Sequence, residues 1–447
     1  MAAESDLRQL SARALAAALR DGRTSAAEVV ERCLERIAAR EEEVRAWTFL
    51  DPDHARRQAG ALDDFRKRGL PMGPLHGVPV GVKDIVDTKD FGTENGTVLH
   101  AGRRPRQDAT IVQRLRSAGA VVLGKTVTTE LAAYAPGKTR NPHDPAHTPG
   151  GSSSGSAAAV ADGMVPLAIG TQTNGSVIRP AAFCGVYGFK PSHGLIPRTG
   201  VLAQSRPLDT IGTMGGFLED AALLAEVLIG ADGHDPDVLP VAPPRLLELL
   251  DQSPPVVPTL AFVRTPVWDQ AEEETRSAFA ELQGALGDRV EEVELPAAFG
   301  RAHDLQRTLM EADFARSFHD LYERGADRLS PTMRGQIERG RTLLAVDYNR
   351  AVEAILVYNT VLDELFDRYD AILTPSAPGP APHGLDTTGS PAFCTIWTLC
   401  GTPALTLPLL RSERGLPIGV QLVGRKNEDG RLLRTARWLV ETLNTAA

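Results

Sequence analysis

The chain has 447 residues, a formal net charge of −9, 42% hydrophobic residues and 23% charged residues. These values are typical of a folded globular protein and exclude disorder of the whole chain, because a disordered chain has too few apolar residues to form a core. The negative net charge argues against sequence-independent nucleic-acid binding, which requires clustered lysines and arginines. At roughly 150 residues per domain, length alone would suggest about three domains.

The four cysteines and the N-terminal segment indicate the cellular compartment. No two cysteines form a Cys-x-x-Cys pair, so the sequence predicts neither a disulfide framework nor a zinc site. The first residues lack the basic and apolar regions of a secretory signal, and no run of about 18 uncharged apolar residues could span a membrane. We therefore expect a cytoplasmic protein with no metal and no other cofactor.

The N-terminal half alternates segments of helical and strand character. Apolar and polar residues recur at helical spacing over residues 7–45, which predicts two helices. The β-branched run at 78–86 predicts a buried strand. Residues 108–118 are again helical in pattern, and 120–123 are the next apolar strand. Helices that alternate with strands predict an α/β protein.

The C-terminal half continues this alternation after a proline-rich segment. Residues 236–258 contain seven prolines, and we interpret them as a connection that wraps around one domain rather than a linker between two. Residues 303–360 are predicted to be mostly helical. Strands are expected at 403–409 and 418–423, and a last helix begins at Asp429.

Two common motifs match the sequence but not its expected local structure. Residues 119–126 fit the phosphate-binding pattern GxxxxGK[ST], but the interior residues favour a strand over a phosphate-binding turn. Residues 151–155 fit the GxSxG pattern, in which Ser153 would be a nucleophile, but the preceding residues cannot form the strand that this motif requires. Later histidines keep this second interpretation open. His143 and His147 lie among prolines, which exclude a helical pair of metal ligands.

Glycines are concentrated between residues 137 and 216. Within this stretch, the 41 residues from 150 to 190 include only three charged ones, so the segment does not resemble a solvated flexible linker. Its glycines and serines alternate with apolar residues, which indicates backbone packed closely inside the protein. Consecutive small residues can direct several backbone N–H groups toward one point, as in an oxyanion hole or an anion site.

Lys83 is the candidate base of this sequence. It lies in the apolar run 78–86, where burial would lower the pKa of its amine by favouring the neutral form. A neutral amine beside serine hydroxyls can act as a general base without a histidine. The alternative is an ion pair between Lys83 and the adjacent Asp84, and the spacing alone leaves it open.

At this point the residues resemble the amidase signature family. The motifs that carry the resemblance are Val82-Lys83-Asp84, the segment 148–153 with Ser152, the segment 170–176 with Ser176, and residues 183–191. The two serines are 24 residues apart, in agreement with the family pattern. Further similarity extends from residue 75 to residue 424, so it covers nearly the whole chain.

The resemblance implies the fold of that family. One α/β domain would span residues 1–447, with a central mixed β-sheet flanked by helices on both faces. The N-terminal helices within 7–45 would pack on this domain, residues 236–258 would connect its parts, and the helical region 303–360 would cover the substrate. A single large domain then replaces the three that the length suggests.

The resemblance also implies an activity. The protein would be an amidohydrolase that cleaves amide-type C–N bonds of linear amides other than peptides, through an acyl-enzyme. Ser176 would be the nucleophile, and Lys83 would act as base through Ser152, which would follow a cis peptide bond. The oxyanion hole would be formed by backbone amides of Thr173, Asn174, Gly175 and Ser176.

The sequence departs from the family pattern near the nucleophile. Gln172 stands where the family commonly has aspartate, and Asn174 stands at a glycine position, although asparagine tolerates positive φ. Arg179 follows Ser176 by three residues where the family has arginine after two. We therefore predict a neutral arrangement in place of an ion pair, with no single charge left unpaired. Ser154 also occupies a usual glycine position, but no member of the triad is lost.

Three classes of function fit these residues. The first is a small-molecule amidase, or a related hydrolase of carbamates, biuret-like compounds or esters. The second is the glutamine-hydrolysing component of a tRNA-dependent amidotransferase, which the negative charge, the length and Gln172 disfavour. The third is a non-catalytic binding protein, which would not need the complete set Lys83, Ser152 and Ser176. We expect a small-molecule substrate and no nucleic-acid or membrane partner, and we leave a homodimer open.

The sequence predicts the substrate pocket in less detail than the catalytic residues. We expect Tyr134, Gly151 and Trp397 to contact the substrate, with walls from residues 131–136, from the helices between 303 and 360, and from residues 396–400. The sequence assigns no charged residue to the acyl pocket. It therefore does not identify the acyl group.

Overall fold

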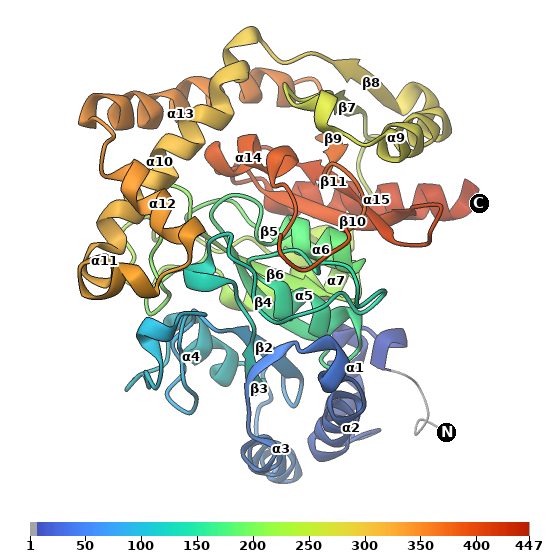
Figure 1. Cartoon of the computed structure of the whole chain (residues 1–447). Helices are drawn as coiled ribbons and strands as arrows, with labels where there is room; N and C mark the ends of the chain where they lie inside the picture. Colours follow the sequence, from blue (N-terminus) through green and yellow to red (C-terminus); the bar gives the residue numbers. More distant parts are fainter. Residues whose placement is uncertain (1–6, 447) are drawn as a thin grey trace.

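The strands of the chain form one large sheet (Figure 1). The computed structural model describes residues 7–446. The strands are β1 Trp47–Leu50, β2 Pro79–Lys83, β3 Val121–Thr126, β4 Leu167–Gln172, β5 Tyr187–Lys190, β6 Thr210–Gly215, β7 Leu260–Val263, β8 Val290–Val293, β9 Ala371–Pro375, β10 Ala404–Arg411 and β11 Pro417–Val423. Across the sheet, the strands of the described residues follow the order β1-β3-β2-β4-β6-β5-β10-β11-β9-β7-β8.

The sheet is mixed. Strand β2 is parallel to both of its neighbours, β3 and β4, and β7 is parallel to β8 and β9. The remaining neighbours are antiparallel. Parallel strands run toward the same edge of a sheet, so the carboxyl ends of β2 and β4 meet there.

Helices occupy most of the remaining chain. They are α1 Ala12–Arg20, α2 Ala26–Val44, α3 Pro52–Lys67, α4 Thr110–Ser117, α5 Ser154–Ala161, α6 Ile178–Cys184, α7 Leu218–Leu228, α8 Leu246–Leu250, α9 Glu273–Leu286, α10 Ala302–Ser317, α11 His319–Gly325, α12 Pro331–Gly340, α13 Ala345–Phe366, α14 Ala392–Leu399 and α15 Asp429–Ala446. None of the helices in the described residues is both long and apolar enough to cross a membrane.

Helices cover both faces of the sheet. Gly212 and Gly215 of β6 are three residues apart and face opposite sides, because successive strand residues alternate. A Cβ atom at Gly212 would contact Val177, directly before α6, whereas one at Gly215 would contact Asp220 of α7. Helices α6 and α7 therefore lie on opposite faces. This confirms the predicted fold class, a single α/β domain with a mixed sheet between helices.

The predicted elements are present, with changes at their ends. The two helices expected in 7–45 are α1 and α2. Strand β2 is shorter than predicted and ends at Lys83, because the chain turns there and Val86 N donates to Lys83 O (3.0 Å). The proline-rich segment 236–258 includes α8, which packs against α7 and α15. Residues 121–126 of the phosphate-binding pattern form strand β3 rather than a turn.

Helices α10 to α13 gather at one end of the molecule, in yellow and orange in Figure 1. With α14 they enclose a hydrophobic core of their own, which includes Phe314, Phe318 and Trp397. Helix α10 packs against both α12 and α14. The segment 303–360 is therefore mostly helical. Through α10 it packs against α14, the helix that follows the loop at residues 384–391.

Gly155 in α5 and Gly284 in α9 provide a matched test of this packing. A Cβ atom at Gly155 would overlap the backbone of Ala46 and Val127, whereas nothing lies within 4 Å of a Cβ atom at Gly284. We expect Gly155→Ala to lower the free energy of unfolding by about 1–3 kcal/mol. Gly284→Ala should raise it by up to about 1 kcal/mol, because alanine favours a helix. Urea unfolding followed by circular dichroism measures both, and equal stability of the two variants would contradict the described packing.

Candidate active site

Lys83 is the last residue of β2, and its side chain is fully buried. Its Nζ donates hydrogen bonds to Ser152 Oγ (2.7 Å) and Thr171 Oγ1 (2.8 Å). The alternative ion pair between Lys83 and Asp84 is not formed. Asp84 instead pairs with Lys125 of β3, whose Nζ lies 3.3 Å from Asp84 Oδ1. Lys83 therefore faces hydroxyl groups rather than a carboxylate.

The sheet explains why these groups meet. Val82 of β2 is paired with Ile169 of β4, so Lys83, one residue further along β2, and Thr171, two residues further along β4, reach the same edge. Burial at this edge lowers the pKa of Lys83 well below its ordinary value, because the charged amine would lose its hydration. The negative charge of Asp209 has a smaller, opposite effect on this pKa. The surroundings therefore favour a neutral amine that can accept a proton.

Ser152 follows a cis peptide bond with Gly151, as the family resemblance implies. Helix α5 begins two residues later, and Ser153 N donates to Ser176 O (3.3 Å), which joins the two serine segments. The Ser153 hydroxyl is hydrogen-bonded to the backbone of Thr171. Since the described chain also has no strand directly before Ser153, the structure does not support it as the nucleophile of a GxSxG motif.

Ser176 lies in the turn between β4 and α6 and is 7% exposed. The backbone N–H groups of residues 173–176 donate no hydrogen bond to any described residue. The next two N–H groups, those of Val177 and Ile178, both donate to Gln172 Oε1 (2.8 and 3.0 Å). Four consecutive N–H groups beside a nearly buried serine are thus available to an oxyanion.

The structure agrees with the predicted neutral arrangement at Gln172 but not at Arg179. Gln172 is hydrogen-bonded through both ends of its amide, since its Nε2 also donates to Thr398 Oγ1 (2.9 Å). Arg179, however, is a fully buried guanidinium that has no carboxylate partner among the described residues. Its Nη2 donates to Gly151 O (2.6 Å) and Thr388 Oγ1 (3.2 Å), and its Nε and Nη1 have no hydrogen-bond partner. The prediction that no single charge would be left unpaired is wrong, because the buried guanidinium of Arg179 has only neutral partners among the described residues.

Asn174 does not use the positive φ that asparagine tolerates. The side-chain Nδ2 donates to Tyr134 Oη (2.8 Å), and Oδ1 accepts from Thr395 Oγ1 (2.8 Å). The asparagine therefore forms part of a polar wall beside residues 173–176, where we expect the oxyanion hole. These four residues are called the oxyanion loop below.

A cavity of about 390 Å³ extends from this wall between α10, α12 and the start of α14. Tyr134 lines it, and its contact with the substrate stays a prediction. Trp397 does not reach it: the indole is fully buried in the core of the α10–α14 region. The predicted contact between Trp397 and the substrate is therefore corrected, because Ala392 and Thr395 on another side of α14 line the cavity instead. The predicted substrate contact of Gly151 stays a prediction.

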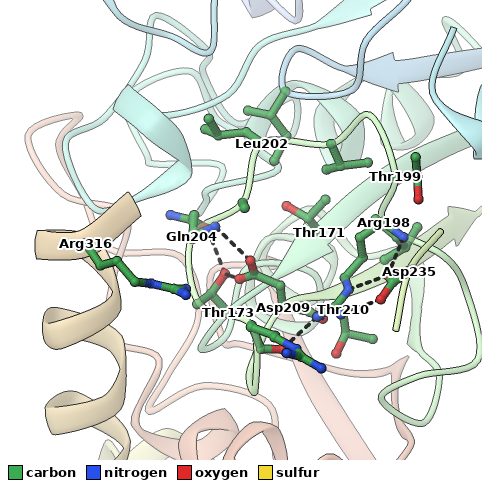
Figure 2. Close-up of a pocket in the computed structure, with 15 residues that line it drawn as sticks. Thr171, Thr173, Arg198, Thr199, Leu202, Gln204, Asp209, Thr210, Asp235 and Arg316 are labelled. Carbon is green, nitrogen blue, oxygen red and sulfur yellow. Dashed lines mark hydrogen bonds and ion pairs between the residues drawn. The ribbon is translucent and has the colours of Figure 1, made fainter. Parts of the chain in front are cut away.

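A second cavity, of about 300 Å³, borders Thr171 and Thr173 (Figure 2). Asp209 lines it and accepts hydrogen bonds from Thr173 Oγ1 (2.6 Å) and from the backbone N–H groups of Gln204 (2.8 Å) and Ser205 (2.9 Å). Burial raises the pKa of Asp209 to about 6. Asp209 thus fixes the first residue of the oxyanion loop and also places its charge near the amine of the candidate base.

Sequence reasoning predicted the main groups but not the residues that hold them. Thr171 was missed, although it lies in the segment 170–176 that also contains Ser176. Asp209 gave no signal, since only folding brings it to the oxyanion loop. The contact between Lys83 and Ser152 is direct, whereas the hydrogen bonds of the described residues do not include one between the Ser152 and Ser176 hydroxyls.

No metal site is evident in the part of the chain that the structure describes. Residues 7–446 contain no group of three or more histidine, cysteine, aspartate or glutamate side chains arranged to hold a metal ion. His147 lies near Asp144 (3.0 Å) and against the ring of His383, in a loop. This agrees with the interpretation of His143 and His147 as loop residues.

The sequence profile of the Amidase family matches residues 28–433. The chain belongs to the amidase signature family. It is 34% identical to one of the subunits of glutamyl-tRNA(Gln) amidotransferase from Chloroflexus aurantiacus, over 96% of each chain. Its structure is similar to that of native peptide amidase from Stenotrophomonas maltophilia, with 28% identity, a TM-score of 0.85 and 96% of each chain covered.

Another similar structure is that of 6-aminohexanoate cyclic dimer hydrolase, with 27% identity, a TM-score of 0.87 and 98% of each chain covered. The names of these proteins refer to quite different substrates. Membership of this amidase-signature hydrolase family therefore leaves the substrate of the present chain to be argued from its own residues.

Asp209→Asn tests the link between the oxyanion loop and Lys83. Removing the negative charge lowers the pKa of Lys83 further, so the neutral amine persists to lower pH and the acid limb of kcat/KM moves to lower pH. Because Thr173 also loses a charged acceptor, we expect kcat to fall about tenfold. Profiles of kcat and kcat/KM against pH measure both effects, with the exposed Asp269→Asn as control. An unchanged acid limb in a folded Asp209→Asn protein would refute the link.

Proposed function

We propose that this protein is an amidohydrolase that cleaves an amide-type C–N bond of a small molecule through an acyl-enzyme at Ser176. The observation that carries the proposal is the fully buried amine of Lys83, hydrogen-bonded to Ser152 Oγ at 2.7 Å. A buried lysine without a carboxylate partner is costly for folding, whereas a neutral lysine is useful as a base. Ser176 and four free backbone N–H groups lie in the adjoining turn.

In the first half of the reaction, Ser176 Oγ attacks the carbonyl carbon of the substrate. Its proton moves to Ser152 Oγ as the Ser152 proton moves to Lys83 Nζ, so Lys83 becomes an ammonium ion. The negative charge on the carbonyl oxygen is stabilised by the N–H groups of residues 173–176. The C–N bond then breaks, the leaving nitrogen takes the proton back through Ser152, and ammonia or an amine departs.

In the second half, water attacks the acyl-enzyme. Its proton passes through Ser152 to Lys83, the oxyanion forms again, and the bond between the carbonyl carbon and Ser176 Oγ breaks. The returning proton restores the Ser176 hydroxyl, and the acid product leaves. Substrate binding must bring the Ser176 hydroxyl to Ser152, since the two are not hydrogen-bonded in the structure.

Carbamates and biuret-like compounds are alternatives for the same site, because they present the same carbonyl carbon and nitrogen leaving group. A second candidate function is glutamine hydrolysis within an amidotransferase, which is favoured by the 34% identity to a component of such an enzyme. It predicts partner proteins that co-purify with the chain. A cytoplasmic location is also proposed, since the four cysteines are free and buried, as in a reducing compartment.

A panel of aryl amides, primary amides including glutamine, carbamates and biuret-like compounds tests the proposal. We expect at least one compound to be hydrolysed, and Ser176→Ala to lower kcat/KM by at least about 10³-fold. Mass spectrometry of a quenched reaction should find the acyl group on Ser176. The exposed Ser253→Ala serves as control. Turnover by Ser176→Ala close to that of the wild type would refute the mechanism.

A further inference from the structure

The cavity beside the oxyanion loop carries an inference about the acyl group. Most of its polar side chains already have partners within the protein. Asn174 donates to Tyr134, Thr395 donates to Asn174, and Gln306 Nε2 donates to the backbone oxygen of Thr173 (3.2 Å). These bonds form the wall nearest to the oxyanion loop and leave few groups free to bind a ligand.

Gln336 of α12 differs from the other buried polar side chains that line this cavity. It lines the cavity and is 4% exposed, yet its Oε1 is buried with no hydrogen-bond partner. A buried carbonyl oxygen without a donor costs free energy, typically about 1–3 kcal/mol, so such atoms in folded proteins need an explanation. A ligand that supplies an N–H group would remove this cost.

The helix that carries Gln336 is held firmly. Arg339 of α12 donates through Nε to Glu311 of α10 at 3.0 Å, and Gly340 packs so closely that a Cβ atom there would overlap the backbone of Glu311. Gln336 lies one turn before these contacts. Its position against the cavity is therefore fixed by packing between α10 and α12, and not by a flexible loop.

The charges that border the cavity are already paired. Glu311 pairs with Arg339, and Arg307 pairs with Asp304 at 2.6 Å. His303 Nε2 is hydrogen-bonded to the backbone oxygen of Ala392 (2.9 Å). The lining thus offers no unpaired ion to a carboxylate or an ammonium group. A neutral group with hydrogen-bond donors fits it better, joined to the reacting carbonyl by an apolar chain past Met310.

We propose that Gln336 is a specificity-determining residue that binds a carboxamide or urea group at the far end of the acyl chain. The N–H of that group donates to Gln336 Oε1, and its carbonyl oxygen can accept from Gln336 Nε2. This inference rests on the proposed function only in placing the reacting carbonyl at Ser176. It names the substrate class as short-chain amides that carry a second neutral amide or urea.

The test measures binding to Ser176→Ala, so it does not depend on turnover. The probes are glutaramide, adipamide and pimelamide, each compared with the monoamide in which isopropyl replaces one carboxamide, such as 6-methylheptanamide for adipamide. Isothermal titration calorimetry gives the Kd of each probe. The three chain lengths cover the span from the reacting carbonyl to Gln336.

The ratio of the monoamide Kd to the diamide Kd is then compared between Ser176→Ala and the double variant that also carries Gln336→Met. Methionine keeps the length of the glutamine side chain but removes the amide. For at least one chain length we expect this ratio to fall at least about fivefold. Gln336→Leu should give the same result, and the exposed Gln252→Met should leave the ratio unchanged. A ratio unaltered by both Gln336 variants, or an equal loss of both probes, would overturn the proposal. A lost preference in the binding assay, together with a wild type that hydrolyses no amide, would support the subsite and refute the proposed function.

Discussion

The burial of one amine is the constraint on which this candidate active site depends. Lys83 stands at the end of a strand whose two neighbours are both parallel to it, so its side chain is enclosed and its nearest groups are the hydroxyls of Ser152 and Thr171. Loss of hydration favours the neutral amine. Ser152 contacts this amine directly, and the turn at Ser176 is joined to the Ser152 segment by the hydrogen bond from Ser153 N to Ser176 O.

Two further charged side chains, those of Asp209 and Arg179, lie next to the residues of this candidate site. Asp209 holds Thr173 and opposes the effect of burial on Lys83, whereas Arg179 is buried without a carboxylate and bonds to the carbonyl of Gly151. Burial also lowers the pKa of Arg179. The oxyanion loop is therefore bordered by one negative and one positive group that do not pair with each other. Preorganised charges of this kind stabilise charge that develops during a reaction.

The features of the fold and of the candidate site that depend on a local sequence pattern could be predicted from the sequence. The apolar run around Lys83 and the small residues around Ser152 and Ser176 predicted a buried base and a close-packed backbone. Other features depend on contacts between distant segments. Asp209 reaches Thr173 only because β6 pairs with β4, and Trp397 turns into the core because α14 packs against α10. The unpaired Arg179 was missed, since no local pattern shows which charges meet after folding.

The central claim is that burial lowers the pKa of Lys83 well below its ordinary value and that the neutral amine activates Ser176. The most direct measurement is the rate at which phenylmethylsulfonyl fluoride labels Ser176, followed by mass spectrometry from pH 5 to 11 in steps of about one unit. The account predicts that labelling rises with pH through one ionisation well below the ordinary lysine pKa of 10.5, and that Lys83→Met abolishes this ionisation. A rate that rises only near pH 10.5, or an unchanged profile in Lys83→Met, would contradict it.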